Sequence, residues 1–237
     1  MPEIVASKIL AMNPFKGAGS LVLRRLLAEP TREWTGIELA RELDLSNPWC
    51  NKVLNTLESE KIVERGGRGL AASTRLIDAK ELLAQWTTVY RFPKNTFHGF
   101  ITKDKDALQG LVGACEKEGW LYAATGRSAL RLKFKAAVSG PETVFISPRG
   151  LGYQAYVDML KCLQTKHGFY KVQSNPDIQV INPVLGRSVY YECENFRGIK
   201  VVSPLQLYLD VKGTNEDLEI PSSAEEYLKR HLPIERL

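Results

Sequence analysis

Asparagine and lysine side chains recur on one face of a predicted helix in the first quarter of the chain. The segment Ser46-Asn47-Pro48 is typical of a helix start, and the apolar spacing predicts that the helix runs to about Glu60. Asn51 and Asn55 lie four residues apart and therefore share a face. An asparagine amide can bind an adenine edge with two hydrogen bonds, and Lys52 can bind guanine or phosphate. This pattern predicts a helix that reads the major groove of double-stranded DNA.

Further candidate DNA contacts flank this helix. Trp49 suits a thymine methyl group or a sugar, and Arg65 and Arg68 in a glycine-rich segment suit the minor groove or the phosphate backbone. The complete set of predicted DNA-binding residues is Ser46, Asn47, Trp49, Asn51, Lys52, Asn55, Arg65 and Arg68. The alternative is a protein-interaction module on which these side chains are merely solvated.

Two more helices and a hairpin are predicted around the candidate helix. Ser20 is the expected N-cap of a first helix that Pro30 ends, and Thr35 opens a second helix that ends at Asp44-Leu45. Residues expected to face inward are Leu21, Leu23, Leu26 and Leu27 in the first helix, Ile37, Leu39, Ala40 and Leu43 in the second, and Cys50, Val53, Leu54 and Leu57 in the third. Two strands, Ile62-Val63 and Leu70–Leu76, then flank the glycines of residues 65–69, which permit a hairpin turn.

Three helices followed by a hairpin with two arginines at its tip are similar to a winged helix-turn-helix domain, here residues 20–76. The segment Glu38–Ser46 resembles the entry of the helix-turn-helix. Residues 1–19 are expected to form an N-terminal arm. Residues 77–92 are expected to form a connector helix, with Leu82, Leu83, Trp86 and Val89 spaced for burial.

The remaining residues, 93–237, are predicted to form a mixed α/β domain large enough for its own core, so that the whole chain is α+β or α/β. The expected elements are a strand at Thr143–Ser147, a helix at Gly152–Leu163, a strand at Ile178–Ile181, a hairpin of Ser188–Glu194 with Ile199–Val202, and a helix from Ser203-Pro204 to about Asp210. In the last helix, Leu205, Tyr208 and Leu209 are expected to be buried and Asp210 solvated. Tyr190 and Tyr191 are expected to be half-buried strand residues.

Two segments of this domain carry a family resemblance. Gly119–Leu132, which contains Thr125-Gly126-Arg127-Ser128, and Val202–Asp210 resemble the C-terminal domain of AbiEi-type antitoxins, the regulators of type IV toxin-antitoxin systems. With the winged helix in front, the resemblance spans about residues 20–232. It implies a transcriptional regulator that regulates its own operon and counters a nucleotidyltransferase-like toxin encoded beside it.

Two other functions stay open. The turn Thr125–Ser128 also looks like the opening of a degenerate nucleotidyltransferase-like fold, in which glycine and serine cradle phosphate. However, Thr143–Arg149 lacks the carboxylate pair that holds magnesium in nucleotidyl transfer, so we expect no enzyme activity. The other alternative is a regulator whose α/β domain binds a small metabolite.

Composition limits the remaining classes of function. The chain has 237 residues and a net charge of +5, a mild preference for anionic partners, and its apolar runs are too short to span a membrane. Four cysteines and three histidines are scattered without a CxxC pair, which predicts neither a disulfide framework nor a metal or cofactor site. We expect a cytoplasmic monomer or homodimer.

Overall fold

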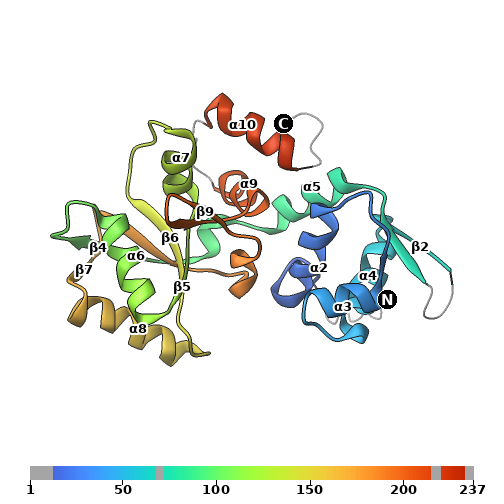
Figure 1. Cartoon of the computed structure of the whole chain (residues 1–237), viewed down its shortest axis with the longest axis horizontal. Helices are drawn as coiled ribbons and strands as arrows, with labels where there is room; N and C mark the ends of the chain where they lie inside the picture. The colour runs from blue at the N-terminus through green and yellow to red at the C-terminus, as the bar shows by residue number, and fades with distance from the viewer. Residues whose placement is uncertain (1–12, 68–71, 215–219, 233–237) are drawn as a thin grey trace, which may run out of the picture. The chain divides into compact units, whose positions relative to one another are not determined.

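The computed structural model describes residues 13–67, 72–214 and 220–232 (Figure 1). The chain divides into two compact units, with the division between Val89 and Tyr90; Leu232 belongs to the first unit. Among the residues that the structure describes, none of the helices has both the length and the apolar character that crossing a bilayer demands.

The first unit combines helices with a small antiparallel sheet. Its elements are α2 (Gly17–Ala28), β1 (Trp34–Thr35), α3 (Gly36–Glu42), α4 (Asn47–Ser59), β2 (Val63–Gly66), β3 (Ser73–Leu76) and α5 (Ala79–Val89). The strand order is β1-β3-β2, so that the short β1 extends the β2–β3 hairpin on its β3 side. The antiparallel pairing of the predicted hairpin is therefore confirmed, but Arg65, predicted at its tip, lies within β2 opposite Thr74. Residues 68–71, which include the predicted tip residue Arg68 and the predicted strand start Leu70, lie outside the described residues.

Local capping fixes the start of two helices. Thr35 forms a capping box: its Oγ1 accepts from the Glu38 amide at 3.1 Å, and its own amide donates to Glu38 Oε2 at 2.8 Å. Ser46 caps α4 by accepting from the Trp49 amide at 3.3 Å, as predicted. These caps satisfy backbone amides in the first turns of α3 and α4, which otherwise have no partner within the helix.

The core of the first unit lies between α2, α3, α4 and α5. The four residues predicted to face inward from α4, Cys50, Val53, Leu54 and Leu57, are all buried. Trp86 of α5 is also buried; its ring lies 6.1 Å from that of Phe15 and 5.2 Å from the Arg24 guanidinium. Helix α5 therefore packs within the first unit.

Several details of this unit differ from the sequence predictions. Helix α2 begins at Gly17 with Lys16 as N-cap, and Ser20 lies inside the helix, where its hydroxyl donates to the Gly17 carbonyl at 2.7 Å. Ile37 is 44% exposed, because only one face of the short α3 meets the core, and Val89 is also exposed. Strand β1 was not predicted, since two residues show no alternation.

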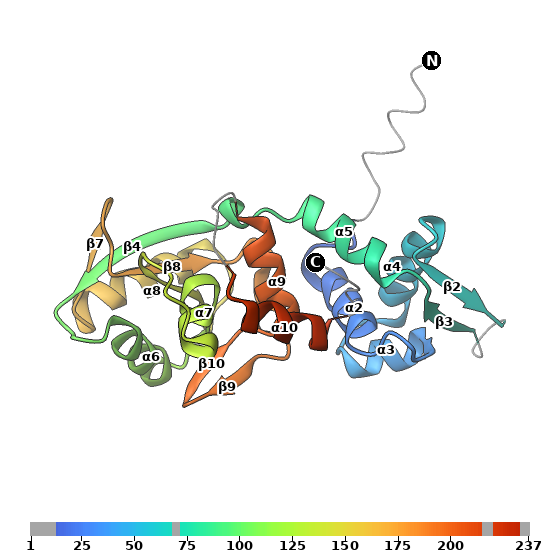
Figure 2. The same cartoon turned by 90° about the horizontal axis from the view of Figure 1, so that it is seen from above.

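The second unit contains a seven-stranded mixed sheet of order β7-β4-β8-β6-β5-β10-β9, in which β6–β8 and β5–β10 are parallel. Its strands are β4 (Thr96–Thr102), β5 (Leu121–Ala124), β6 (Glu142–Ser147), β7 (Phe169–Val172), β8 (Ile178–Asn182), β9 (Glu194–Phe196) and β10 (Ile199–Val201). Its helices are η3 (Phe92–Lys94), α6 (Ala107–Glu118), α7 (Gly126–Phe134), α8 (Tyr153–Lys166), η4 (Gly186–Tyr190), α9 (Pro204–Gly213) and α10 (Ser222–His231). Helices α7, α9 and α10 pack together (Figures 1 and 2). The unit is thus mixed α/β, as predicted.

The predicted strands at 143–147 and 178–181 and the predicted helices at 152–163 and 203–210 are confirmed, with ends shifted by a few residues. The first arm of the predicted hairpin is wrong: residues 186–190 form the 3-10 helix η4, and only Glu194 of that arm enters a strand. Ser188 and Val189 are both buried, and burial of consecutive residues suits a helical turn better than a pleated strand. Tyr190 and Tyr191 therefore do not lie in a strand.

The prediction of a solvated Asp210 is also wrong. Its side chain is 1% exposed and accepts from Gln206 Nε2 at 2.7 Å, from the Tyr90 hydroxyl at 2.5 Å and from the Thr125 hydroxyl. Asn95 extends this buried cluster by donating to the Tyr90 hydroxyl at 3.2 Å. The cluster ties α9 to the start of α7 and to the segment that enters the second unit. Tyr208, expected to be buried, is partly exposed.

Candidate nucleic-acid interface

Three asparagines form a polar row along the outer face of α4. Asn47, Asn51 and Asn55 follow one another at four-residue spacing, which places them one above the other. Asn51 Nδ2 donates to Asn47 Oδ1 at 2.7 Å and to the Asn47 carbonyl at 3.0 Å. The amide of Asn51 is therefore held in one orientation by the preceding turn.

Arg65 of β2 connects this row to the hairpin. Its Nη2 donates to Asn51 Oδ1 at 2.7 Å, and its Nη1 donates to Asn55 Oδ1. Arg65 lies opposite Thr74 in the strand register, and the buried Thr74 marks that face of the hairpin as the one turned toward the rest of the unit. We call Asn47, Asn51, Asn55 and Arg65 the asparagine–arginine row.

Gly36, the first residue of α3, permits this arrangement. A Cβ atom at Gly36 would lie 2.8 Å from Asn51 Nδ2 and 2.9 Å from Asn47 Oδ1, closer than real Cβ contacts allow. The absence of a side chain thus leaves room for the two amides beside the start of α3. Sequence reasoning missed Gly36, although a glycine in the first turn of a helix is a signal, because glycine there weakens the helix relative to alanine.

The other predicted contact residues differ in exposure and in hydrogen bonding. Lys52 is exposed, and its ammonium group has no hydrogen bond or ion pair with the described residues. The indole N–H of the half-buried Trp49 also lacks a partner in that part of the chain. The Ser46 hydroxyl oxygen is occupied by its capping bond. Arg68 lies outside the described residues.

The opposite face of the hairpin carries a charge pair of its own. Glu64 and Arg75 face each other across β2 and β3, and Arg75 Nη2 lies 2.8 Å from Glu64 Oε2. Because successive strand residues point to opposite faces, this pair lies on the other side of the hairpin from Arg65. Arg65 and Arg75 therefore lie on the same hairpin in different surroundings. Arg65 lies beside α4, and Arg75 is paired with the Glu64 carboxylate.

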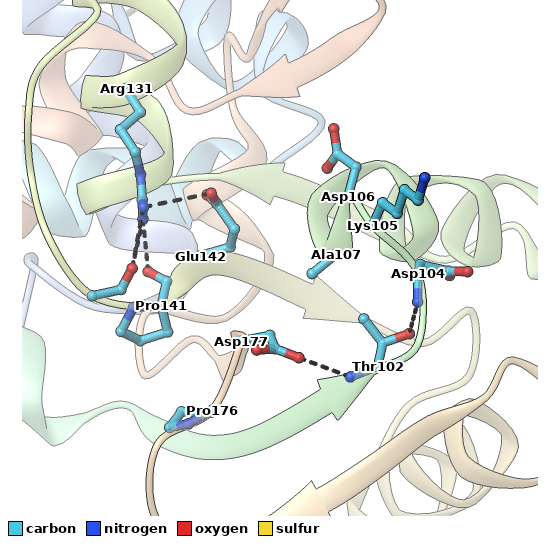
Figure 3. Close-up of a pocket in the computed structure, with 11 residues that line it drawn as sticks. Thr102, Asp104, Lys105, Asp106, Ala107, Arg131, Pro141, Glu142, Pro176 and Asp177 are labelled. Carbon is cyan, nitrogen blue, oxygen red and sulfur yellow. Dashed lines mark hydrogen bonds and ion pairs between the residues drawn. The ribbon is translucent and has the colours of Figure 1, made fainter.

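The second unit contains a polar pocket of about 640 Å³ at the start of α6 and the ends of β4 and β6 (Figure 3). The charged residues that line it are Asp104, Lys105, Asp106, Arg131, Glu142 and Asp177. Several of these groups are already engaged: Arg131 donates to the Pro141 carbonyl at 2.9 Å and pairs with Glu142 at 3.6 Å, and Asp177 accepts from the Thr102 amide at 2.9 Å. The pocket can hold a small polar molecule.

The turn Thr125–Ser128, weighed as a phosphate cradle, lies at the start of α7. Ser128 is buried; its hydroxyl donates to Glu142 and accepts from the Thr143 amide at 2.6 Å. Thr143 Oγ1 in turn donates to the Thr125 carbonyl at 2.6 Å. These hydrogen bonds connect the turn to β6, and both the donor and the acceptor of the Ser128 hydroxyl are bonded within the protein.

Comparison of the chain with family models, with curated proteins and with solved structures gave no match.

Proposed function

We propose that the chain is a DNA-binding transcriptional regulator and that its first unit is a winged helix-turn-helix domain. The element order α2-β1-α3-α4-β2-β3 and the strand order β1-β3-β2 support this proposal. In it, α3 and α4 form the helix-turn-helix, α4 enters the major groove, and the β2–β3 hairpin is the wing.

The observation that carries the proposal is the position of Arg65 between Asn51 and Asn55. Each terminal nitrogen of the guanidinium uses one N–H for an asparagine and keeps a second N–H. Such donors can bind guanine O6 or N7, or phosphate oxygens. The side chain is thereby oriented before DNA binds, so less conformational entropy is lost on binding.

These hydrogen bonds give the predicted DNA-binding residues different roles. Both polar atoms of Asn51 are used within the protein, so Asn51 positions Arg65. Asn55 contributes only its oxygen to Arg65 and keeps the Nδ2 donor for DNA. Lys52 is exposed beside the row and supplies a charge for the phosphate backbone.

The test is a fluorescence-anisotropy titration of the full chain on the DNA upstream of its own gene and on a scrambled duplex, at several salt concentrations. With about three to five phosphates neutralised, we expect log Kd to rise with log salt concentration with a slope of about 3 to 4. Tighter binding to the upstream DNA supports a sequence-specific regulator. Equal and weak binding to both duplexes would refute it.

Arg65→Ala and Arg75→Ala form a matched pair for the same titration. Both remove one positive charge from the hairpin, but only Arg65 belongs to the asparagine–arginine row. We expect Arg65→Ala to weaken specific binding by about 1 to 3 kcal/mol and Arg75→Ala to have a much smaller effect. Equal losses would show that only the charge of the hairpin matters, and would contradict the assigned role of Arg65.

We further propose that the chain regulates its own operon and counters a nucleotidyltransferase-like toxin, as the resemblance of Gly119–Leu132 and Val202–Asp210 to AbiEi-type antitoxins implies. The second unit would then carry the antitoxin function. Co-expression of the neighbouring gene with the full chain and with Asp210→Ala tests this. Equal growth with the full chain and with an empty vector would contradict the antitoxin role for that neighbour.

The pocket of the second unit favours a second candidate, a regulator that responds to a small polar metabolite. Four carboxylates and two cations line it, so a cationic ligand fits best. A ligand that raises the melting temperature of the full chain, but not of Asp104→Ala, would support this function. Absence of any shift across a panel of polyamines and amino acids would count against it.

A further inference from the structure

Three side chains of different chemistry meet where α6 and α8 end. Glu118 is the last residue of α6, Cys162 lies in the last two turns of α8, and His167 is the C-cap of α8. One carboxylate oxygen, the thiol sulfur and one imidazole nitrogen lie within 4.8 Å of one another. His167 Nε2 is 3.0 Å from Glu118 Oε1. We call these residues the helix-end cluster.

The donor set of this cluster is one that binds zinc. A thiolate, an imidazole and a carboxylate coordinate Zn²⁺ at about 2.3, 2.0 and 2.1 Å, which in tetrahedral geometry places the donor atoms roughly 3.3 to 3.7 Å apart. The observed hydrogen bond of 3.0 Å has to open by only a few tenths of an ångström. The sulfur has to approach by at most about 1.3 Å to reach those tetrahedral separations.

The backbone holds the donors in place. Gly119 ends α6 in the left-handed region, with φ of +66°, and the Trp120 amide bonds back to the Cys115 carbonyl at 2.9 Å. The Trp120 ring then meets the His167 ring nearly edge to face, at 6.2 Å. The His167 side chain is 10% exposed and that of Glu118 is 24% exposed, so the cluster is shielded but open to water on one side.

We propose that Glu118, Cys162 and His167 form a site for a divalent cation that prefers sulfur and nitrogen, Zn²⁺ foremost, with water as the fourth ligand. Binding releases the proton of the Cys162 thiol to water. The proton that His167 Nε2 donates to Glu118 must also leave that nitrogen, to Nδ1 or to water, so that the metal replaces this hydrogen bond. Spacing along the sequence predicted no metal site, because 49 residues separate Glu118 from His167 and only the fold brings them together. The site is independent of the DNA-binding proposal.

The test is isothermal titration of the full chain with ZnCl₂ after removal of metals with a chelator, together with absorption spectra in Co²⁺. We expect one ion per chain and a thiolate-to-cobalt charge-transfer band. Cys162→Ser and His167→Gln should each weaken zinc binding by more than about 100-fold and Cys162→Ser should abolish the band. Cys193→Ser is the matched control, since Cys193 is also half-buried but lies outside the cluster.

The proposal is overturned if the native chain binds no stoichiometric zinc, or if Cys162→Ser binds as tightly as Cys193→Ser. Circular dichroism establishes that each variant is folded before titration. Should His167→Gln fail to fold, Glu118→Gln replaces it, because that variant keeps the size of the side chain and removes the anionic ligand. Tight binding by that variant would equally contradict the assignment of Glu118.

Discussion

The two units each contain a network of polar side chains, and the networks differ in exposure. In the first unit the asparagine–arginine row lies at the surface, with Asn55 exposed and Asn51 and Arg65 partly so. In the second unit Tyr90, Thr125 and Gln206 surround a carboxylate, Asp210, that is almost fully buried. Both networks join distant pieces of chain, 14 residues apart for Asn51 and Arg65 and 120 for Tyr90 and Asp210.

The comparison shows how burial separates two uses of similar hydrogen bonds. Water competes for the bonds of an exposed network, so that network contributes little to stability, and its donors can still reach a ligand. Water cannot enter a buried network, so that removal of one side chain takes a hydrogen-bond partner from the others and water does not replace it. We therefore expect changes in the first network to affect DNA binding and changes in the second to affect folding.

The largest effect is expected from Asp210→Ala. It removes the acceptor of three buried hydrogen bonds, from Tyr90, Thr125 and Gln206, and the loss of a buried hydrogen bond costs about 1 to 3 kcal/mol. The free energy of unfolding of the second unit should fall by at least about 3 kcal/mol, measured by urea unfolding. Asp210→Asn keeps an acceptor oxygen and should lose less. Similar stability of the native chain and Asp210→Ala would break the contrast between the two networks.

The double variant Asn51→Ala, Asn55→Ala tests the exposed network in the same way. Arg65 loses both groups that orient it, so specific DNA binding should weaken by about 1 to 3 kcal/mol. The unfolding free energy should change by no more than about 0.5 kcal/mol, because the bonds are open to water. Unchanged affinity for the upstream DNA would contradict the positioning role.

Gly36→Ala tests the exposed network further, because we expect it to lower the affinity for DNA without lowering the stability of the protein. The new Cβ displaces the ends of the Asn47 and Asn51 side chains, which are partly exposed and can shift outward. Gly36 is the first helical residue, where alanine gains less than the about 0.5 to 1 kcal/mol that it gains in a helix interior, so the melting temperature should stay the same or rise slightly. DNA binding should weaken about threefold, less than for removal of the amides. A lower melting temperature without a change in affinity would contradict this reasoning.

The smallest effect concerns Glu194, an intermediate case in the second unit. Burial alone would raise its pKa, but hydrogen bonds from Lys133 and Tyr227 outweigh burial and lower the pKa below 4.5. Its contribution to stability is therefore present above pH 4.5 and is lost as the pH falls through the lower folded value. Glu194→Gln should cost less than about 1 kcal/mol at pH 7, because the carboxylate is partly solvated.

Thermal unfolding between pH 3 and 7 measures this effect. The difference between native chain and Glu194→Gln should shrink as the pH falls below 4.5. A difference that stays constant with pH would show that Glu194 acts only through its shape.

What the sequence could predict follows from the distance over which each signal acts. Helix α4 was predicted with its cap and its buried stripe, because Ser46, Pro48 and the apolar spacing are all local. The bonds between Arg65 and the asparagines were not predicted, since they depend on how the hairpin folds beside the helix. Asp210 was assigned to solvent because its partners at Tyr90 and Thr125 are remote in sequence.

The order of strands in the second sheet has a consequence for synthesis on the ribosome. The elements from α2 to α5 all lie within the first 89 residues, and their sheet pairs within that stretch, so most of this unit can form early. Strand β4, by contrast, lies between β7 and β8, so its edges stay unpaired until residues 169–182 have emerged. During that interval β4 is an open template for another strand, and nascent chains crowded on one messenger are most at risk of pairing there.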